Sequence, residues 1–427
     1  MKHPIFFLAA TALTLFSCAK KEPSSRETSP KNQSESAQTR AIKEFVSSLD
    51  DHVKISQLFL VNIEGSEKYR AVEKTADGSP LLPGGCLFFS YNIASSPEKI
   101  ATFTESIKSY YIENKNIPPY IAVDQEGGDV NRLRKITSTL PSQKWVSENF
   151  SEAKAKSLYA LQASQLRLLG INMNLAPVVE AENERNAHFL GTRTFGSAGN
   201  VVSYAGEEIA GYEENGIATV LKHFPGNSDA DPHSNLPEIR TTKEELERDY
   251  IQPFRTLLTK SSAVLMSHAR VTVSDDEAFS AEKKVPACLS PFWVTGIVRN
   301  ELGFGGLILS DDIFMAALSE NGFPPEKACI QALEAGIDVI MLSEKKFGMV
   351  AELLLEKAKS SESFNELVEK AVCRVIQYKI NAGLLSVMSE KTESGETRSR
   401  IVVNENRPAY DKEAFSAAYT QGMELYK

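Results

Sequence analysis

The stretch KHFPGNSDADPH, residues 222–233, brings together side chains that can bind polar ligands or move protons. It contains Lys222, His223, Asp231 and His233, and so holds two of the six histidines of the chain. Its two prolines and one glycine predict a loop rather than a helix or a strand. An imidazole suits general acid/base chemistry because its unperturbed pKa of about 6.5 lies close to neutrality. A carboxylate at Asp231 can orient the ring of His233 and stabilise its charged form.

Further polar residues stand at the ends of apolar runs. Asp124 ends one run, His268 ends another, and the pair Asp311 and Asp312 ends a third. A carboxylate at a strand end can act as a nucleophile, and a nearby imidazole can then give or take a proton. An aspartate pair is also typical of a solvated strand end or a helix N-cap. Since side chains alternate along a strand, only one aspartate of the pair is expected to face a ligand.

The apolar runs themselves predict the elements that position these groups. Unbroken rather than alternating apolarity is typical of strands that are buried on both faces, as in a parallel sheet covered by helices. His268 lies inside such a run, so it is either a wall of a site or a satisfied core histidine. There are eight runs: residues 57–62, 85–90, 120–125, 171–177, 217–222, 263–268, 306–311 and 338–343.

Helical patterns lie between these runs. Residues 97–111 place Ile100, Phe103 and Ile107 on one face, and residues 151–169 are bounded by Ser151 and Gly170. Thr242 with Glu245 predicts a capping box at the start of another helix. Eight strand–helix units over about 340 residues predict an α/β fold of the (β/α)8 TIM-type barrel. A doubly wound open sheet is the alternative, although no GxGxxG follows any of the runs.

A barrel places catalytic groups at the carboxyl ends of its strands, where Asp124, Lys222, His223 and Asp311 are expected to meet. The loop that carries Asp231 and His233 would then lie over the barrel mouth.

Composition narrows the range of partners. The net charge of -9 and the absence of basic clusters in the body of the chain give no indication of a nucleic-acid partner. The four cysteines after residue 40 are widely spaced, and no HExxH occurs, so neither a disulfide framework nor a metal site nor a cofactor is expected. These cysteines are Cys86, Cys288, Cys329 and Cys373.

The first residues predict export. Lys2 is followed by the run PIFFLAATALTLF and then by Cys18, and the end LFSC resembles a bacterial lipobox. We expect residues 1–17 to be a signal peptide, Cys18 to be lipidated, and residues 18–40 to form a flexible tether to a membrane of the bacterial cell envelope. The alternative is an uncleaved anchor, but the 13 apolar residues fall short of the roughly 20 that span a bilayer.

Longer motifs resemble a known family. AVDQEGGDVNRLR (122–134), GTRTFG (191–196), KHFPG with DPH (222–233), LMSHARV (265–271) and EAGIDVIML (334–342) follow one another in the order and spacing of family 3 glycoside hydrolases. The chain is most similar to their bacterial β-N-acetylglucosaminidase branch. The resemblance covers residues 41–385, which we expect to form one catalytic barrel domain, and leaves 386–427 as a polar C-terminal tail without an assigned role.

The resemblance implies different roles for the polar residues. Asp311 corresponds to the family's nucleophile, and His233 with Asp231 corresponds to its acid/base pair. Glu180 stands where an aspartate is common, and Asn227 where a histidine is common. The residues that correspond to sugar-binding positions are Asp124, Arg132, Arg193, Lys222 and His223.

The resemblance also implies a carbohydrate substrate with a non-reducing β-linked N-acetylglucosamine, from peptidoglycan fragments or chitin-type oligosaccharides. Two alternatives remain. A β-glucosidase-type enzyme of the same family takes its general acid from a second domain, for which 42 residues after the barrel are too few. A catalytically inactive sugar-binding lipoprotein is the other.

Overall fold

The computed structural model describes residues 36–229, 236–276, 279, 284–391, 397–405 and 409–427. The signal peptide and Cys18 therefore lie outside the described residues, as do Asp231 and His233. Residues 37–427 form one compact unit. Within the described part of the chain, no helix is long and apolar enough to cross a membrane.

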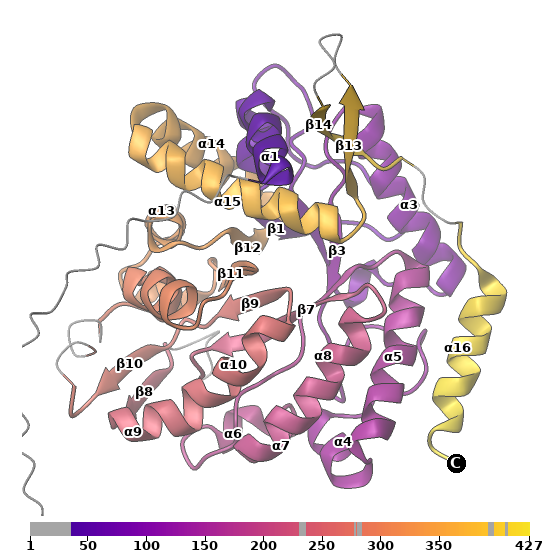
Figure 1. Ribbon diagram of the computed structural model, residues 1–427, viewed down its shortest axis with the longest axis vertical. Helices are drawn as coiled ribbons and strands as arrows, with labels where there is room; N and C mark the ends of the chain where they lie inside the picture. The colour runs from indigo at the N-terminus through magenta and orange to yellow at the C-terminus, as the bar shows by residue number, and fades with distance from the viewer. Residues whose placement is uncertain (1–35, 230–235, 277–278, 280–283, 392–396, 406–408) are drawn as a thin grey trace, which may run out of the picture. The chain divides into compact units, whose positions relative to one another are not determined.

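Eight parallel strands among the described residues close into a barrel, in the order β1-β12-β11-β9-β7-β6-β3-β2. Each of the eight apolar runs overlaps one barrel strand, so the prediction of a (β/α)8 barrel is confirmed (Figure 1). The strands are β1 (Phe59–Asn62), β2 (Gly85–Phe88), β3 (Tyr120–Val123), β6 (Met173–Asn174), β7 (Ala218–Phe224), β9 (Ala263–Met266), β11 (Leu307–Asp312) and β12 (Val339–Ser343).

Alternate side chains of these strands enter two different cores, which explains the unbroken apolarity of the runs. Leu60, Ala122 and Leu309 belong to a cluster inside the barrel. Their neighbours Val61 and Ile308 belong to a larger cluster between the strands and the surrounding helices. Because both faces of each strand are buried, no polar position is required along it until the strand ends.

The helices of the outer layer follow the sequence patterns closely. The helix that begins after Ser151 has the Ser151 hydroxyl as its N-cap and ends at Gly170, whose φ of 86° suits a glycine. Thr242 and Glu245 form the predicted capping box. The outer helices are α2 (Asp51–Ser56), α3 (Pro97–Glu113), α4 (Gln143–Asn149), α5 (Glu152–Leu169), α6 (Ala187–Leu190), α7 (Ala198–Asn200), α8 (Gly206–Glu213), α9 (Lys243–Glu245), α10 (Gln252–Leu257), α12 (Ala316–Glu320), α13 (Pro325–Ala335), α14 (Glu344–Ser360) and α15 (Glu362–Asn381), with a wider helical segment at Phe292–Glu301.

The prediction of a helix after every strand is wrong for the first of the eight strand–helix units. The structure describes every residue between β1 and β2 and shows no helix there. The segment 63–84 instead turns back on itself through a bridge between Lys74 and Pro80. Small two-stranded pairs extend the barrel elsewhere: β4 (Gln125–Gly127) with β5 (Val130–Asn131), and β8 (Glu238–Thr241) with β10 (Arg270–Val273).

The two ends of the compact unit differ from the expected domain boundaries. Helix α1 (Ala37–Ser48) buries Ala41, Ile42 and Val46 and contacts α15, so the chain is already folded before residue 40. The segment after residue 385 forms a hairpin of β13 (Leu385–Lys391) and β14 (Thr397–Val403), followed by α16 (Lys412–Glu424). The hairpin contacts α1, and α16 contacts α5, so neither is a detached tail.

Candidate active site

The carboxyl ends of the barrel strands surround an open cavity of about 560 Å³. Six residues singled out from the sequence line this one cavity, although they come from four different strand ends or loops. They are Asp124, Arg132, Arg193, Lys222, His223 and Asp311. Placement at the carboxyl ends of the strands is where (β/α)8 barrels carry their active sites.

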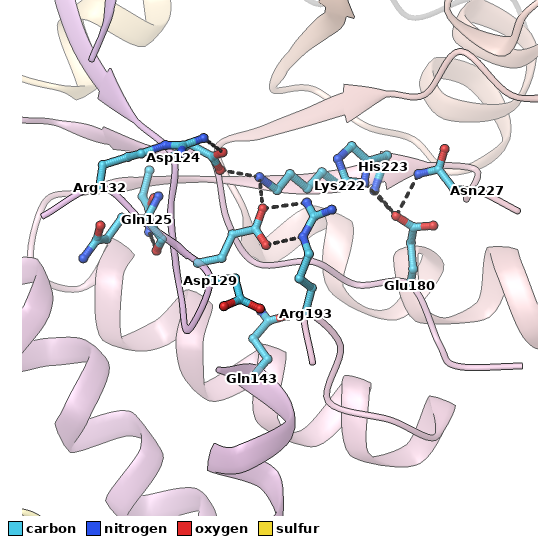
Figure 2. Close-up of polar contacts among 12 residues, drawn as sticks. Asp124, Gln125, Asp129, Arg132, Gln143, Glu180, Arg193, Lys222, His223 and Asn227 are labelled. Carbon is cyan, nitrogen blue, oxygen red and sulfur yellow. Dashed lines mark hydrogen bonds and ion pairs between the residues drawn. The ribbon is translucent and has the colours of Figure 1, made fainter. Parts of the chain in front are cut away.

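Asp124 follows β3 and lies between two cations. Lys222 Nζ lies 2.6 Å from Asp124 Oδ1, and Arg132 Nη2 donates a hydrogen bond of 3.2 Å to Asp124 Oδ2 (Figure 2). The Lys222 side chain is buried, whereas Asp124 and Arg132 retain partial exposure to the cavity. A carboxylate and a guanidinium with free edges toward a cavity can bind the hydroxyl groups of a sugar.

Glu126 lies beneath this pair and is the residue that sequence reasoning missed. Its carboxylate accepts hydrogen bonds of 2.8 Å from Arg193 Nε and from Arg193 Nη2, and Lys222 Nζ lies 2.6 Å away. Burial raises the pKa of Glu126, but the charges of Lys222 and Arg193 outweigh it and hold the pKa well below its usual range. The spacing could have indicated Glu126, because it stands two positions after Asp124 and residues two apart on an extended segment share a face.

Glu180, in the loop after β6, fixes the ring of His223. Glu180 Oε1 lies 2.6 Å from His223 Nδ1 and accepts a further hydrogen bond of 3.1 Å from Asn227 Nδ2 (Figure 2). Since a carboxylate accepts, His223 Nδ1 is the donor, and the other ring nitrogen is left for the cavity side. Glu180 and Asn227, two of the positions at which the sequence departs from the family pattern, therefore take part in one buried contact.

Asp311 is the next-to-last residue of β11 and lines the cavity. Its Oδ1 accepts a hydrogen bond of 2.8 Å from the backbone amide of Asp312. Burial raises the pKa of Asp311, but the neighbouring His268, His223 and Lys222, together with that amide, outweigh it and lower the pKa. Asp311 is thus held in the ionised form that a nucleophile requires.

The expectation that only one of the paired aspartates faces the cavity is wrong. Asp311 and Asp312 both line it. The register between β11 and β12 shifts between Leu309 and Asp312, and such an irregularity interrupts the alternation of side chains. Asp312 has a local partner as well, because its Oδ1 accepts the backbone amide of Phe314 at 2.9 Å.

His268 lies behind the wall rather than in it, and it is not among the described residues that line the cavity. Its Nδ1 lies 3.1 Å from Cys288 Sγ, and its Nε2 lies 3.0 Å from the carbonyl oxygen of Asp312. Of the two roles considered for His268, the buried histidine with hydrogen-bond partners is the one observed.

The loop with Asp231 and His233 begins at the cavity. Asp229, the last described residue before it, lines the cavity and accepts the backbone amide of Phe189 at 3.3 Å. His188, next to Phe189 on α6, is a second cavity-lining imidazole beside His223.

Aromatic rings complete the cavity rim. Phe89 lies 5.4 Å from the guanidinium carbon of Arg132 and stacks on Tyr91 with a centroid distance of 6.1 Å. Phe189 lies 5.8 Å from the guanidinium carbon of Arg193. Carboxylates beside aromatic faces suit a sugar ring, which presents both hydroxyl groups and apolar C–H faces. No group of three or more His, Cys, Asp or Glu side chains placed to hold a metal ion occurs in the described part of the chain.

Fold and site together define a (β/α)8-barrel enzyme with a charged, carbohydrate-type cavity at the strand ends. The sequence profile of the glycosyl hydrolase family 3 N-terminal domain matches residues 50–378, most of the chain. The protein belongs to glycosyl hydrolase family 3 and is a glycoside hydrolase.

Relatives of known name agree with this assignment. A β-hexosaminidase of Idiomarina loihiensis is 30% identical over 320 residues, which cover 72% of this chain and 92% of that protein. The structure of a family 3 β-N-acetylglucosaminidase from Paenibacillus sp. has a TM-score of 0.70 at 26% identity and covers 88% of this chain and 69% of its own. A fungal multi-domain β-N-acetylglucosaminidase of the family has a TM-score of 0.72 at 25% identity, and this chain spans 42% of it.

Proposed function

We propose that the protein is a retaining β-N-acetylglucosaminidase that hydrolyses terminal β-linked N-acetylglucosamine. The observation that carries the proposal is the position of Asp311, an ionised carboxylate at a strand end that shares one cavity with the cations and carboxylates around Asp124. The substrate class is supported by the names of the relatives, which are β-hexosaminidases and β-N-acetylglucosaminidases.

In the proposed mechanism, Asp311 attacks the anomeric carbon while the glycosidic bond breaks. His233 donates its proton to the leaving oxygen, and Asp231 stabilises the imidazolium form of that ring. In the second step His233 removes a proton from water, which displaces Asp311 and releases the sugar with its original anomeric configuration. Asp124, Arg132, Arg193, Lys222 and His223 bind the sugar throughout.

The assignment of the acid/base pair is supported by the start of its loop. Asp229 lines the cavity only two residues before Asp231. A loop at the cavity wall can bring its next residues to the leaving oxygen, whereas a β-glucosidase-type enzyme would need another source of acid. A protein that only binds sugar would keep the cavity and show no turnover.

The test compares Asp311→Ala and His233→Ala, with His188→Ala as the control imidazole from the same cavity. Asp311→Ala should abolish turnover of every substrate, since no leaving group bypasses the nucleophile. His233→Ala should slow glycosylation strongly for a disaccharide and less for a nitrophenyl glycoside, whose leaving group needs no proton. Rates and accumulated covalent enzyme are measured for both substrates.

Azide separates the two roles. Azide needs no deprotonation, so it should restore turnover of His233→Ala and give a glycosyl azide of the same anomeric configuration as the substrate. With Asp311→Ala an anion in the vacated space attacks the substrate directly, and the product should be inverted. Equal losses for both leaving groups in His233→Ala without azide rescue would contradict the acid/base assignment.

We further propose that the protein acts in the bacterial cell envelope, tethered to a membrane by lipid on Cys18. The support is the lipobox-like LFSC after an apolar run. An envelope enzyme of this specificity would meet N-acetylglucosamine in peptidoglycan fragments, with chitin-type oligosaccharides as the alternative source. A panel of aryl glycosides and of both oligosaccharide types would separate these substrates.

A further inference from the structure

The C-terminal helix α16 packs against the part of the barrel that supports the substrate cavity. Its buried residues Phe415, Ala418 and Gly422 form one stripe along the helix, which lies against α5 (Figure 1). The family match ends at residue 378, so α16 lies beyond the part of the chain that the family profile describes.

At Gly422 the backbone of α16 comes close to Ser138. A Cβ atom at this position would lie 2.2 Å from Ser138 Oγ, so only glycine fits without movement. Ser138 is itself held by two buried glutamines of α5. Gln162 Nε2 donates to the Ser138 carbonyl at 2.8 Å, and the Ser138 amide donates to Gln165 Oε1 at 2.8 Å. Ser138 is therefore fixed between α5 and α16.

The end of α16 and the residues after it also contact the next residue, Thr139, which is exposed. The hydroxyl group of Tyr426 donates a hydrogen bond of 2.9 Å to the Thr139 carbonyl, and Thr139 Oγ1 lies 3.5 Å from Met423 Sδ. The Tyr426 ring packs against Trp145 and Phe150 at centroid distances of 5.9 and 5.5 Å. These contacts hold the outer side of residues 138–139.

The inner side of the same segment supports the β4–β5 hairpin directly. The Leu140 carbonyl accepts the Gly128 amide at 3.1 Å and Asn131 Nδ2 at 3.3 Å. At Gly127 a Cβ atom would lie 2.1 Å from the Pro141 carbonyl oxygen. The backbone of residues 140–141 thus contacts the backbone of the hairpin directly. Because no flexible side chain lies between them, a shift of residues 138–141 is expected to move the hairpin.

We infer that α16 is a buttress for substrate binding: it holds residues 138–141 against the β4–β5 hairpin and thereby positions Asp124 and Arg132 in the cavity and the buried Glu126 beneath them. Glu126 lies on β4, and Asp124 and Arg132 flank the hairpin on either side. The residues of α16 are positioning residues. The inference rests on the proposed function in taking Asp124 and Arg132 as sugar-binding residues.

The inference is tested with substitutions in α16 that weaken its contact with Ser138 and leave the cavity residues unchanged. Gly422→Leu and the milder Gly422→Ala force α16 away from Ser138, and Gln421→Leu changes the exposed neighbouring position as a matched control. A change in tryptophan emission reports whether the helix has moved, because Trp145 contacts Tyr426 whereas the other tryptophan, Trp293, is buried in the core. Measurements are made on the full chain, well below its unfolding temperature.

In the Gly422 variants, hydrogen exchange of residues 124–134 should become faster in the free enzyme. The KM for substrate and the Kd for N-acetylglucosamine should rise roughly tenfold, because a shift of less than 1 Å in the binding groups is enough. The kcat should change less than about twofold, since Asp311 lies on another strand and the lost contacts act in ground state and transition state alike. Gln421→Leu should match the wild type.

Two results would overturn the inference. One is a changed Trp145 emission with unaltered exchange of residues 124–134. The other is a lowered unfolding temperature with unaltered KM and Kd, which would make α16 a stabilising element only. If Gly422→Leu does not fold, the same measurements on Gly422→Ala test the inference. If the wild type binds no N-acetylglucosamine, the proposed function fails, whereas the exchange measurement still tests the buttress.

Discussion

At the scale of single residues, the cavity is built on charges that neutralise one another. Glu126 is buried and is the common partner of Lys222 and Arg193, two cations that are among the residues lining the cavity. Removing this carboxylate alone is expected to lower stability strongly, because it leaves Lys222 and Arg193 without their buried counter-charge. Glu126 is therefore expected to matter for stability and binding together, without contacting the substrate.

Glu126→Ala should lower the free energy of unfolding by about 3–5 kcal/mol, as expected when one member of a buried ion pair is removed. It should also lower kcat/KM about 100-fold by releasing Arg193. Urea unfolding and steady-state kinetics measure the two effects. Glu182→Ala removes an ion pair with Lys144 of similar length, 2.9 Å, but at the surface, and should cost less than about 1 kcal/mol. Equal costs for the two variants would contradict the buried-network interpretation.

At the scale of elements, the barrel interior is filled by side chains whose fit depends on neighbouring strands. Tyr120 of β3 is buried and packs edge-on against Tyr378 of α15 at 5.2 Å. Its ring occupies the space beside Gly85 of β2, where a Cβ atom would lie 2.3 Å from Tyr120 Cζ. The glycine at the start of β2 is thus required by a ring from the adjacent strand rather than by its own backbone conformation.

Gly85→Ala should destabilise the barrel by about 1–3 kcal/mol, the usual cost of overpacking a filled core. The thermal unfolding midpoint measures the loss. Gly305→Ala is the matched control, because a Cβ atom at Gly305 meets nothing within 4 Å. Should the two variants unfold at the same temperature, Tyr120 would not be as tightly confined as the structure shows.

At the scale of the whole molecule, stability and pH are linked through a buried glutamate next to the site. Glu208 of α8 accepts a hydrogen bond of 3.0 Å from Gln143 of α4. Burial raises the pKa of Glu208 from 4.5 to about 8, with the charge of Glu126 adding to the rise. The folded protein therefore holds the proton more tightly than the unfolded chain does between these two values.

The contribution of Glu208 to stability is full below pH 4.5 and is lost as the pH rises toward about 8. Glu208→Gln keeps the neutral shape at every pH. The variant should match the wild type near pH 5 and exceed it at higher pH, by about 1.4 kcal/mol for each unit up to the folded pKa. Urea unfolding from pH 5 to 8.5 measures this, with Glu207→Gln as control. A difference independent of pH would refute the linkage.

The proposed membrane tether is likewise a property of the whole chain. Cys18→Ala should release the protein from membranes into the soluble fraction, since the lipid would be the anchor and the apolar leader would otherwise be removed. Fractionation with an antibody against the barrel, together with mass analysis of the mature N-terminus, measures this. A variant that remains with membranes and keeps residues 1–17 would show an uncleaved anchor instead.

The sequence sufficed for the barrel strands and for the meeting of Asp124, Lys222, His223 and Asp311. Runs buried on both faces are recognisable locally, and polar residues at their ends must gather wherever parallel strands close into a barrel. The caps at Ser151 and Thr242 were also predictable from the sequence, because a helix cap involves residues within one turn of each other.

Features that depend on partners far apart in the chain became visible in the folded structure alone. The burial of Glu126 depends on Arg193 and Lys222, and the role of Glu180 depends on how His223 lies beside it. The shift in register at Asp312 arises in the pairing of β11 with β12, which lie on separate stretches of the chain. The docking of Gly422 on Ser138 joins positions 284 residues apart (422 − 138), and no local periodicity records such a contact.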